Sequence, residues 1–160
     1  MLRPPMAGDS DRPGVVVLPP LLYGGAFIAA LLLRWIRPLP MVPAWAALWP
    51  GIVLALLGMG IMVVGRRAME SVGTNVNPML PTTAIVTSGL FRFTRNPLYV
   101  GMTIFYVGLT LALNTWWGAI LLAPVLIVMH GGVILREERY LERKFGAAYR
   151  EYRSKVRRYL

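Results

Sequence analysis

Two clusters of polar residues lie where apolar segments begin and end. The first runs from Arg95 to Gly101 and reads Arg-Asn-Pro-Leu-Tyr-Val-Gly, at the point where a polar loop enters an apolar segment. The second is the pair Glu137 and Glu138, at the point where the next apolar segment gives way to a basic tail. Guanidinium, phenol and carboxylate groups can bind and orient a charged ligand, and ionisable residues at membrane depth suggest function by default. These two clusters are the candidate site.

A short turn at residues 114–115 joins the two apolar segments into a hairpin. Counting equal distances from the turn predicts that Tyr99 lies level with His130, and Arg92 level with Glu137. If both arms are straight antiparallel helices, each residue adds the same rise on either arm. We therefore expect both polar clusters in one layer, on one side of a membrane.

The composition favours a membrane protein with basic ends. The chain has 160 residues, is 56% hydrophobic and has a formal net charge of +10, a combination natural for several spans with basic cytoplasmic flanks. The absence of cysteine excludes disulfides, thiolate nucleophiles and cysteine metal ligands. With one histidine and seven carboxylates, we expect no metal site. The expected partners are a lipid bilayer and a lipophilic molecule, with no nucleic acid.

The hydropathy pattern predicts an all-α integral membrane protein with four transmembrane helices. We expect them at residues 15–36, 45–65, 98–113 and 116–135. They belong to a single domain at residues 15–160, preceded by a disordered tail at residues 1–14. The third span has 16 residues and reaches only ~24 Å, short of the ~30 Å hydrocarbon core. Such a short span can still work if its inner end opens into a protein-lined, partly wet cavity.

Two polar segments flank the hairpin. The loop at residues 68–96 is rich in Gly, Asn, Pro and Thr, which predicts a structured cytoplasmic loop with specific turns. Residues 136–157 alternate aromatic and basic side chains at steps of three to four, which predicts an amphipathic helix. That helix can lie on an anionic leaflet or pack on the cytoplasmic loop, and the pattern leaves both open.

The basic residues predict the orientation. With four spans, fifteen of the 17 Lys and Arg residues fall on one side, and only Arg34 and Arg37 on the other. All five tryptophans fall on that other side, as half of an interfacial aromatic belt would. We therefore expect both termini in the cytoplasm. Arginine outnumbers lysine 15 to 2, which hints at a GC-rich bacterial genome and so at the bacterial inner membrane.

A family resemblance rests on these same residues. The stretch from Thr87 to Gly101, the hydrophobic hairpin, Glu137-Glu138 and the spaced aromatic residues after them resemble the isoprenylcysteine carboxyl methyltransferase and phospholipid methyltransferase superfamily. Its pattern is Arg-His-Pro-x-Tyr-x-Gly, a hydrophobic stretch, then Glu-Glu. The pieces at 73–78 and 81–83 look like its bacterial branch. Asn96 stands where the family has histidine, and asparagine can hydrogen-bond but cannot titrate.

The resemblance implies S-adenosylmethionine bound at the cytoplasmic end of the hairpin, under the C-terminal helix, and methyl transfer to a lipophilic acceptor such as a carboxylate, amine or thiol. Arg95 can meet the cofactor's carboxylate, and Glu137 or Glu138 can accept from its ammonium or ribose. Tyr99 can place its ring or hydroxyl near the cationic sulfur or the adenine. The expected cofactor-binding residues are Arg95, Asn96, Pro97, Leu98, Tyr99, Gly101, Glu137 and Glu138.

The catalytic candidates are Arg92 and His130. If a proton must leave the acceptor, His130 is the only imidazole that can replace the family histidine. A histidine within a span can also serve only as a hydrogen-bonding group between helices. Two other functions stay open: an NADPH-dependent reductase of related fold, and a non-catalytic membrane scaffold.

Overall fold

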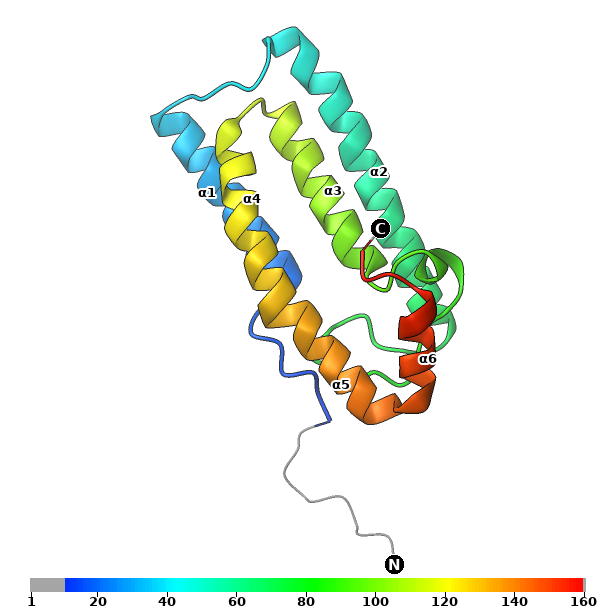
Figure 1. Ribbon diagram of the computed structural model, residues 1–160. Helices are drawn as coiled ribbons and strands as arrows, with labels where there is room; N and C mark the ends of the chain where they lie inside the picture. Colours follow the sequence, from blue (N-terminus) through cyan, green and yellow to red (C-terminus); the bar gives the residue numbers. More distant parts are fainter. Residues whose placement is uncertain (1–10, 160) are drawn as a thin grey trace, which may run out of the picture.

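The computed structural model describes residues 11–159, and across them the chain is helical and contains no β-strand. Four apolar helices form the bundle, and shorter helices gather at one of its ends (Figure 1). The bundle helices are α1 (Pro19–Ile36), α2 (Ala44–Ser71), α3 (Pro97–Ala112) and α4 (Trp116–Val128). The remainder are a 3-10 turn η1 (Gly89–Arg92), a π-helical segment η2 (Met129–Ile134), α5 (Leu135–Phe145) and α6 (Ala147–Lys155).

Within residues 11–159, three helical segments are long and apolar enough to cross a membrane. They are Pro19–Ile36, Ala44–Ser71 and the continuous helix Trp116–Phe145, which comprises α4, η2 and α5. The fourth apolar helix, α3, has 16 residues and is too short to count among them. The predicted all-α membrane class is therefore confirmed, whereas the number of four spans stays a prediction.

Helices α2 and α3 pack closely because glycines face each other across their interface. A side-chain carbon added at Gly58 would lie 2.7 Å from the carbonyl oxygen of Gly101, and one added at Gly101 would lie 2.9 Å from that of Gly58. Real side chains essentially never approach that closely, so the backbones can meet only where both residues lack a side chain. This contact fixes the first turns of α3 against the middle of α2.

The predicted hairpin turn is confirmed, and it is anchored to the preceding connection. Asn114 has a φ of 50°, which asparagine tolerates better than most residues. Its side-chain oxygen accepts from the backbone N–H groups of Met41 (2.8 Å) and Val42 (3.0 Å), and its Nδ2 donates to the Val42 carbonyl at 2.8 Å. The α1–α2 and α3–α4 connections therefore meet at one end of the bundle (Figure 1).

The hairpin arms are less regular than two straight neighbouring helices. Helix α4 packs mainly against α1, and α3 mainly against α2. The helix that begins with α4 widens into the π-helical η2 at Gly131-Gly132, and the Gly132 carbonyl accepts from the Val16 N–H at 3.2 Å. Such π-segments frequently occur at functional sites. A buried core of Tyr23, Tyr106 and residues of α4 and η2 fills the space between α1, α3 and α4.

The predicted C-terminal helix is two helices. Gly146, with a φ of 53°, separates α5 from α6 in a conformation that L side chains rarely adopt. The aromatic side chains Tyr140, Tyr149 and Tyr152 are 4%, 2% and 9% exposed, so they face the protein. The apolar face of this region is therefore used in packing on the loop, and the leaflet-surface alternative is wrong for these three side chains.

Residues 11–14 pack on α5, which corrects the predicted disordered tail there. The Asp11 carboxylate pairs with Lys144 at 2.7 Å and accepts from the Tyr140 hydroxyl at 2.8 Å. Hydrogen bonds from Lys144 and Tyr140 lower the pKa of Asp11. Arg136 donates to the Gly14 carbonyl at 2.9 Å. The predicted tail's residues 1–10 lie outside the described residues.

Candidate active site

A cavity of about 280 Å³ lies at the end of the bundle where α3 begins and α5 starts. Its volume is just below the roughly 300–1,000 Å³ of small-molecule pockets. Apolar residues from the start of α1, the end of α2 and the first turns of α3 form much of its wall, and the polar groups come from the loop, α5 and α6. The apolar lining includes Leu18, Pro20, Met69, Leu98, Met102 and Leu141.

The loop between α2 and α3 forms one wall, and it is held by its own threonines. The Thr74 hydroxyl is buried and accepts from the backbone N–H of Thr83 at 3.1 Å, while the Thr83 hydroxyl donates to the Gly73 carbonyl at 2.8 Å. Thr82 donates from its backbone to the Tyr140 hydroxyl at 3.1 Å. The predicted structured loop is confirmed. Its contribution to the cavity, by Thr74 and Asn75 among others, was not among the predicted site residues.

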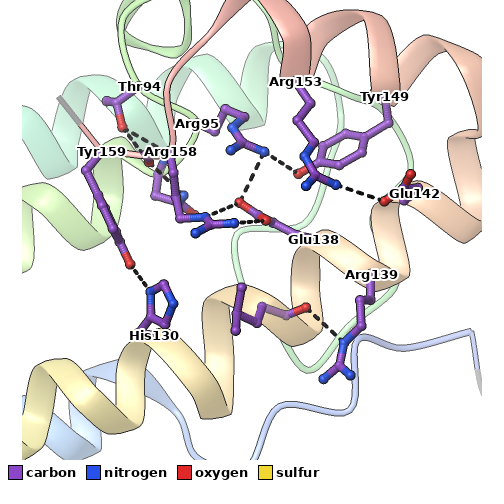
Figure 2. A network of polar contacts seen from close by, with 12 residues as sticks. Thr94, Arg95, His130, Glu138, Arg139, Glu142, Tyr149, Arg153, Arg158 and Tyr159 are labelled. Carbon is purple, nitrogen blue, oxygen red and sulfur yellow. Dashed lines mark hydrogen bonds and ion pairs between the residues drawn. The ribbon is translucent and has the colours of Figure 1, made fainter.

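Glu138 is the centre of a buried ionic network (Figure 2). Its carboxylate, 7% exposed, pairs with Arg95 Nη1 at 3.1 Å and accepts from both Nε and Nη2 of Arg158 at 2.8 Å. The bond with Glu138 raises the pKa of Arg158. Two guanidiniums around one carboxylate leave one positive charge in excess. Arg95 Nε is buried and has no hydrogen-bond partner among the described residues, so this donor is available to a ligand.

Helix α6 closes the cavity with two tyrosines. Arg95 Nη1 donates to the Tyr149 hydroxyl at 3.5 Å, and the Tyr152 hydroxyl donates to the Phe91 carbonyl at 2.8 Å. Burial raises the pKa of both phenols above their ordinary value. Tyr149 and Tyr152 therefore stay protonated at neutral pH and act as hydrogen-bonding walls. Sequence reasoning placed them on a helix that completes the site but did not count them among the site residues.

Glu137 has a different environment from its neighbour. Its two carboxylate oxygens accept from the Tyr99 hydroxyl at 2.8 and 2.9 Å. No ion pair among residues 11–159 includes Glu137. A carboxylate has roughly four acceptor positions, so one phenol leaves most of them unused. Glu137 is therefore the lining carboxylate best placed to accept from a cationic ligand.

The contact of Tyr99 with Glu137 corrects the depth count, which placed Tyr99 beside His130. Helical side chains tilt toward the N-terminus of their own helix. Tyr99 therefore points away from the hairpin turn, and Glu137 points back toward it. Equal counting along the arms ignored this opposite tilt and the irregular η2 segment. The broader expectation, that the two polar clusters meet in one layer, is confirmed.

Seven of the predicted residues line the cavity, and three lie elsewhere. Gly101 lies in the α2–α3 interface. Arg92 is exposed at the end of η1. His130 Nδ1 shares a hydrogen bond of 2.6 Å with the Tyr159 hydroxyl (Figure 2), and neither residue lines the cavity. The residues that do line it are Arg95, Asn96, Pro97, Leu98, Tyr99, Glu137 and Glu138.

Residues 156–159, which we call the strap, also support the site. The strap leaves α6 in extended conformation and returns to the start of α3, where the Arg157 carbonyl accepts from the Arg95 N–H at 2.9 Å. The sequence prediction continued the helix to residue 157 and so missed this return. No spacing signal in the strap distinguishes Arg158 from the other basic residues of the tail.

The apolar helices can cross a membrane, and an ionic cavity lies at one end of the bundle. These features define an integral membrane protein with a candidate site for a polar ligand beside apolar surface. A sequence model of the phospholipid methyltransferase family matches residues 46–148. This match covers more than half of the chain, which therefore belongs to that family.

Three relatives are similar to parts of the chain. The protein-S-isoprenylcysteine O-methyltransferase of Schizosaccharomyces pombe is 36% identical over 72 residues, 45% of this chain and 30% of the relative. That of Dictyostelium discoideum is 25% identical over 130 residues, 73% of this chain and 50% of the relative. An uncharacterised Haemophilus influenzae protein is 39% identical over 66 residues, 39% of this chain and 100% of the relative. This chain thus spans at most half of either methyltransferase. No solved structure matches significantly.

Proposed function

We propose that the protein is an S-adenosylmethionine-dependent methyltransferase acting on a lipophilic or membrane-embedded acceptor, with its active site at the cytoplasmic membrane face. The family match and the relatives named protein-S-isoprenylcysteine O-methyltransferase support methyl transfer beside a membrane. The acceptor group is a carboxylate, amine or thiol attached to an apolar chain. The apolar lining at Leu18, Pro20 and Met102 suits such a chain.

The observation that carries the proposal is the pair of unequal carboxylates in one cavity. S-adenosylmethionine carries a carboxylate, an ammonium, a cationic sulfur and ribose hydroxyls. Glu137, bound only by the Tyr99 phenol among the described residues, can accept from a cation or hydroxyl. The excess positive charge around Glu138, with the unpartnered Arg95 Nε, can attract the carboxylate. The residues therefore fit the charge pattern of this cofactor.

When bound, S-adenosylmethionine supplies a methyl group already activated by its positive sulfur. The protein then has to orient the two partners and keep water away, which can account for a large share of the rate enhancement. Arg95 and Glu137 would hold the polar groups, and Tyr99 would keep Glu137 in place. Tyr149 and Leu141 close the wall around them. No catalytic triad is required for this chemistry.

The structure favours transfer without a protein base. Asn96 cannot titrate, and its side chain donates to the Arg158 carbonyl at 2.9 Å. His130 is engaged with Tyr159 and does not line the cavity. An acceptor that is already ionised as a carboxylate, or present as a free amine, needs no proton removed. We therefore place such acceptors ahead of a thiol, which would have to lose its proton.

The proposed membrane orientation rests on charge and on the tryptophans. Trp35, Trp45 and Trp49 are 85%, 83% and 70% exposed at the end of the bundle opposite the cavity. The sequence places fifteen basic residues on the cavity side of a four-span arrangement. A reporter active only in the periplasm should function when fused after Thr115 and fail after Leu160. The reverse pattern would overturn this orientation.

The cofactor proposal is tested by calorimetry on the purified protein. We expect S-adenosylmethionine to bind with measurable heat and NADPH to give none under the same conditions. Binding of NADPH alone would instead support a membrane reductase. Binding of neither by a protein that unfolds cooperatively would favour a scaffold without catalytic function.

A further inference from the structure

The strap fixes the residues that begin α3 by binding their backbone and side chains. Thr94 pairs with Arg157 in an isolated parallel bridge, and the Thr94 hydroxyl donates to the Arg158 carbonyl at 3.1 Å. Asn96 Nδ2 donates to that same carbonyl at 2.9 Å. The short segment that carries Arg95 is therefore held from both sides. Its orientation toward the cavity depends on a strap that lies more than sixty residues away in sequence.

Within the strap, the neighbouring arginines point in different directions, as successive residues of an extended segment do. The Arg157 side chain is exposed and takes part in none of the ion pairs of residues 11–159. The Arg158 side chain turns inward, is 29% exposed and reaches both oxygens of Glu138 (Figure 2). Arg158 does not itself line the cavity.

The two-bond contact of Arg158 with Glu138, which we call the fork, determines how Arg95 can bind Glu138. A guanidinium and a carboxylate prefer to meet through two parallel bonds. Arg158 takes that position, since its Nε and Nη2 each lie 2.8 Å from a different oxygen of Glu138. Arg95 is left with a single contact, from Nη1 at 3.1 Å, and its Nε has no partner in the described part of the chain. Without Arg158, Arg95 could turn to take both oxygens.

We propose that Arg158 is a positioning residue, which occupies Glu138 in two-bond fashion and so keeps the Arg95 guanidinium available to the anionic group of the ligand. This inference rests on the proposed function and adds to it a residue outside the cavity. It differs from a purely structural ion pair, because the loss of Arg158 should change ligand affinity through Arg95 more than it changes folding.

The test compares three variants, R158A, R158K and R157A, with the wild type by titration with S-adenosylmethionine and by thermal unfolding. R158A should weaken binding on the order of 10-fold, as expected for a charge-assisted hydrogen bond. R158K keeps the charge but cannot form the fork, so it should restore less than half of the lost binding free energy. R157A is the matched control from the same strap and should change affinity by less than about 2-fold. Full recovery in R158K would overturn the positioning role.

A double-mutant cycle separates action through Glu138 from direct ligand contact. In an E138Q background the fork is already lost, so R158A should add less than about 2-fold. An equal loss in both backgrounds would show that Arg158 acts independently of Glu138 and would overturn the inference. Lower unfolding temperature with unchanged affinity in R158A would overturn it too, since that is the result of a structural pair. If R158A does not fold, the R158K and R158Q variants provide the same comparison.

Failure of the proposed function is recognised separately. If the wild-type protein binds no S-adenosylmethionine, the proposed function is overturned. The positioning claim is then decided by hydrogen exchange of the backbone at residues 94–98. R158A, but not R157A, should speed exchange there, because of the two strap arginines only Arg158 binds Glu138 and so anchors the carbonyl that accepts from Thr94 and Asn96. Equal exchange in both variants would overturn the positioning claim as well.

Discussion

Glu137 and Glu138 are adjacent in sequence, yet they have opposite environments. Glu138 is enclosed by two guanidiniums, whereas Glu137 contacts one phenol. Successive residues on an α-helix point about 100° apart, since one turn takes 3.6 residues. The two side chains therefore leave α5 toward different partners. Glu137 is suited to ligand binding, and Glu138 is suited to holding the site together. Two identical neighbouring residues in the sequence give no sign of this difference.

The largest expected effect is on stability, at Glu138. Glu138→Gln removes the charge that compensates Arg95, which is 8% exposed. Breaking a buried pair from one side typically costs about 3–5 kcal/mol, because a buried charge is left without its partner. We expect a clear fall in the unfolding temperature in detergent. Glu142→Gln is the control, since its pair with Arg153 is 36% and 46% exposed and should be nearly neutral. Equal effects at both positions would remove the structural role assigned to Glu138.

A smaller effect is expected at Tyr99. Tyr99→Phe removes the hydroxyl that donates to Glu137, while the ring and its packing remain. A hydrogen bond of this kind to a charged group contributes about 1.5–3 kcal/mol. A bound ligand that donates to Glu137 can replace part of this contribution. We expect weaker S-adenosylmethionine binding, and an unfolding temperature that falls less than in Glu138→Gln. Tyr106→Phe is the control, because its hydroxyl donates to the Gly118 carbonyl away from the cavity. Equal affinities in the two variants would argue against Tyr99 as the support of Glu137.

The smallest effect on rate is expected at His130. His130→Gln keeps hydrogen-bonding capacity but cannot titrate. Because His130 binds Tyr159 outside the cavity lining, we expect a modest loss of thermal stability and less than about 10-fold loss of methyl transfer. General-base loss would cost about 10²–10⁴ in rate. A fall of 100-fold or more, with cofactor affinity and stability unchanged, would make His130 the base.

Much of the fold could be predicted because hydropathy and turn residues report it directly. The apolar segments, the turn at Asn114 and the meeting of the two polar clusters all follow from local patterns. Contacts between segments that lie far apart in the sequence could not be predicted. The strap, the break at Gly146 and the contact of Asp11 with α5 each involve residues whose local sequence also suits a solvated basic helix or tail.

The residues of the candidate site were predicted better than the contacts between them. Seven of the predicted residues line the cavity, but the depth count paired Tyr99 with the wrong residue. Arg95 was expected to bind the cofactor directly, and in the structure its charge is already shared with Glu138. Side-chain direction and competition between two arginines for one carboxylate decide these pairings, and neither is visible in residue spacing.

The central claim, that Glu137 is the ligand-binding carboxylate, is tested most directly by titrating wild-type and Glu137→Gln proteins with S-adenosylmethionine. The account predicts that the wild type binds and that the variant binds roughly 10- to 150-fold more weakly, which corresponds to about 1.5–3 kcal/mol. It also predicts an unfolding temperature that does not fall, because Glu137 forms no ion pair among residues 11–159. Unchanged affinity in a folded Glu137→Gln protein would contradict the account.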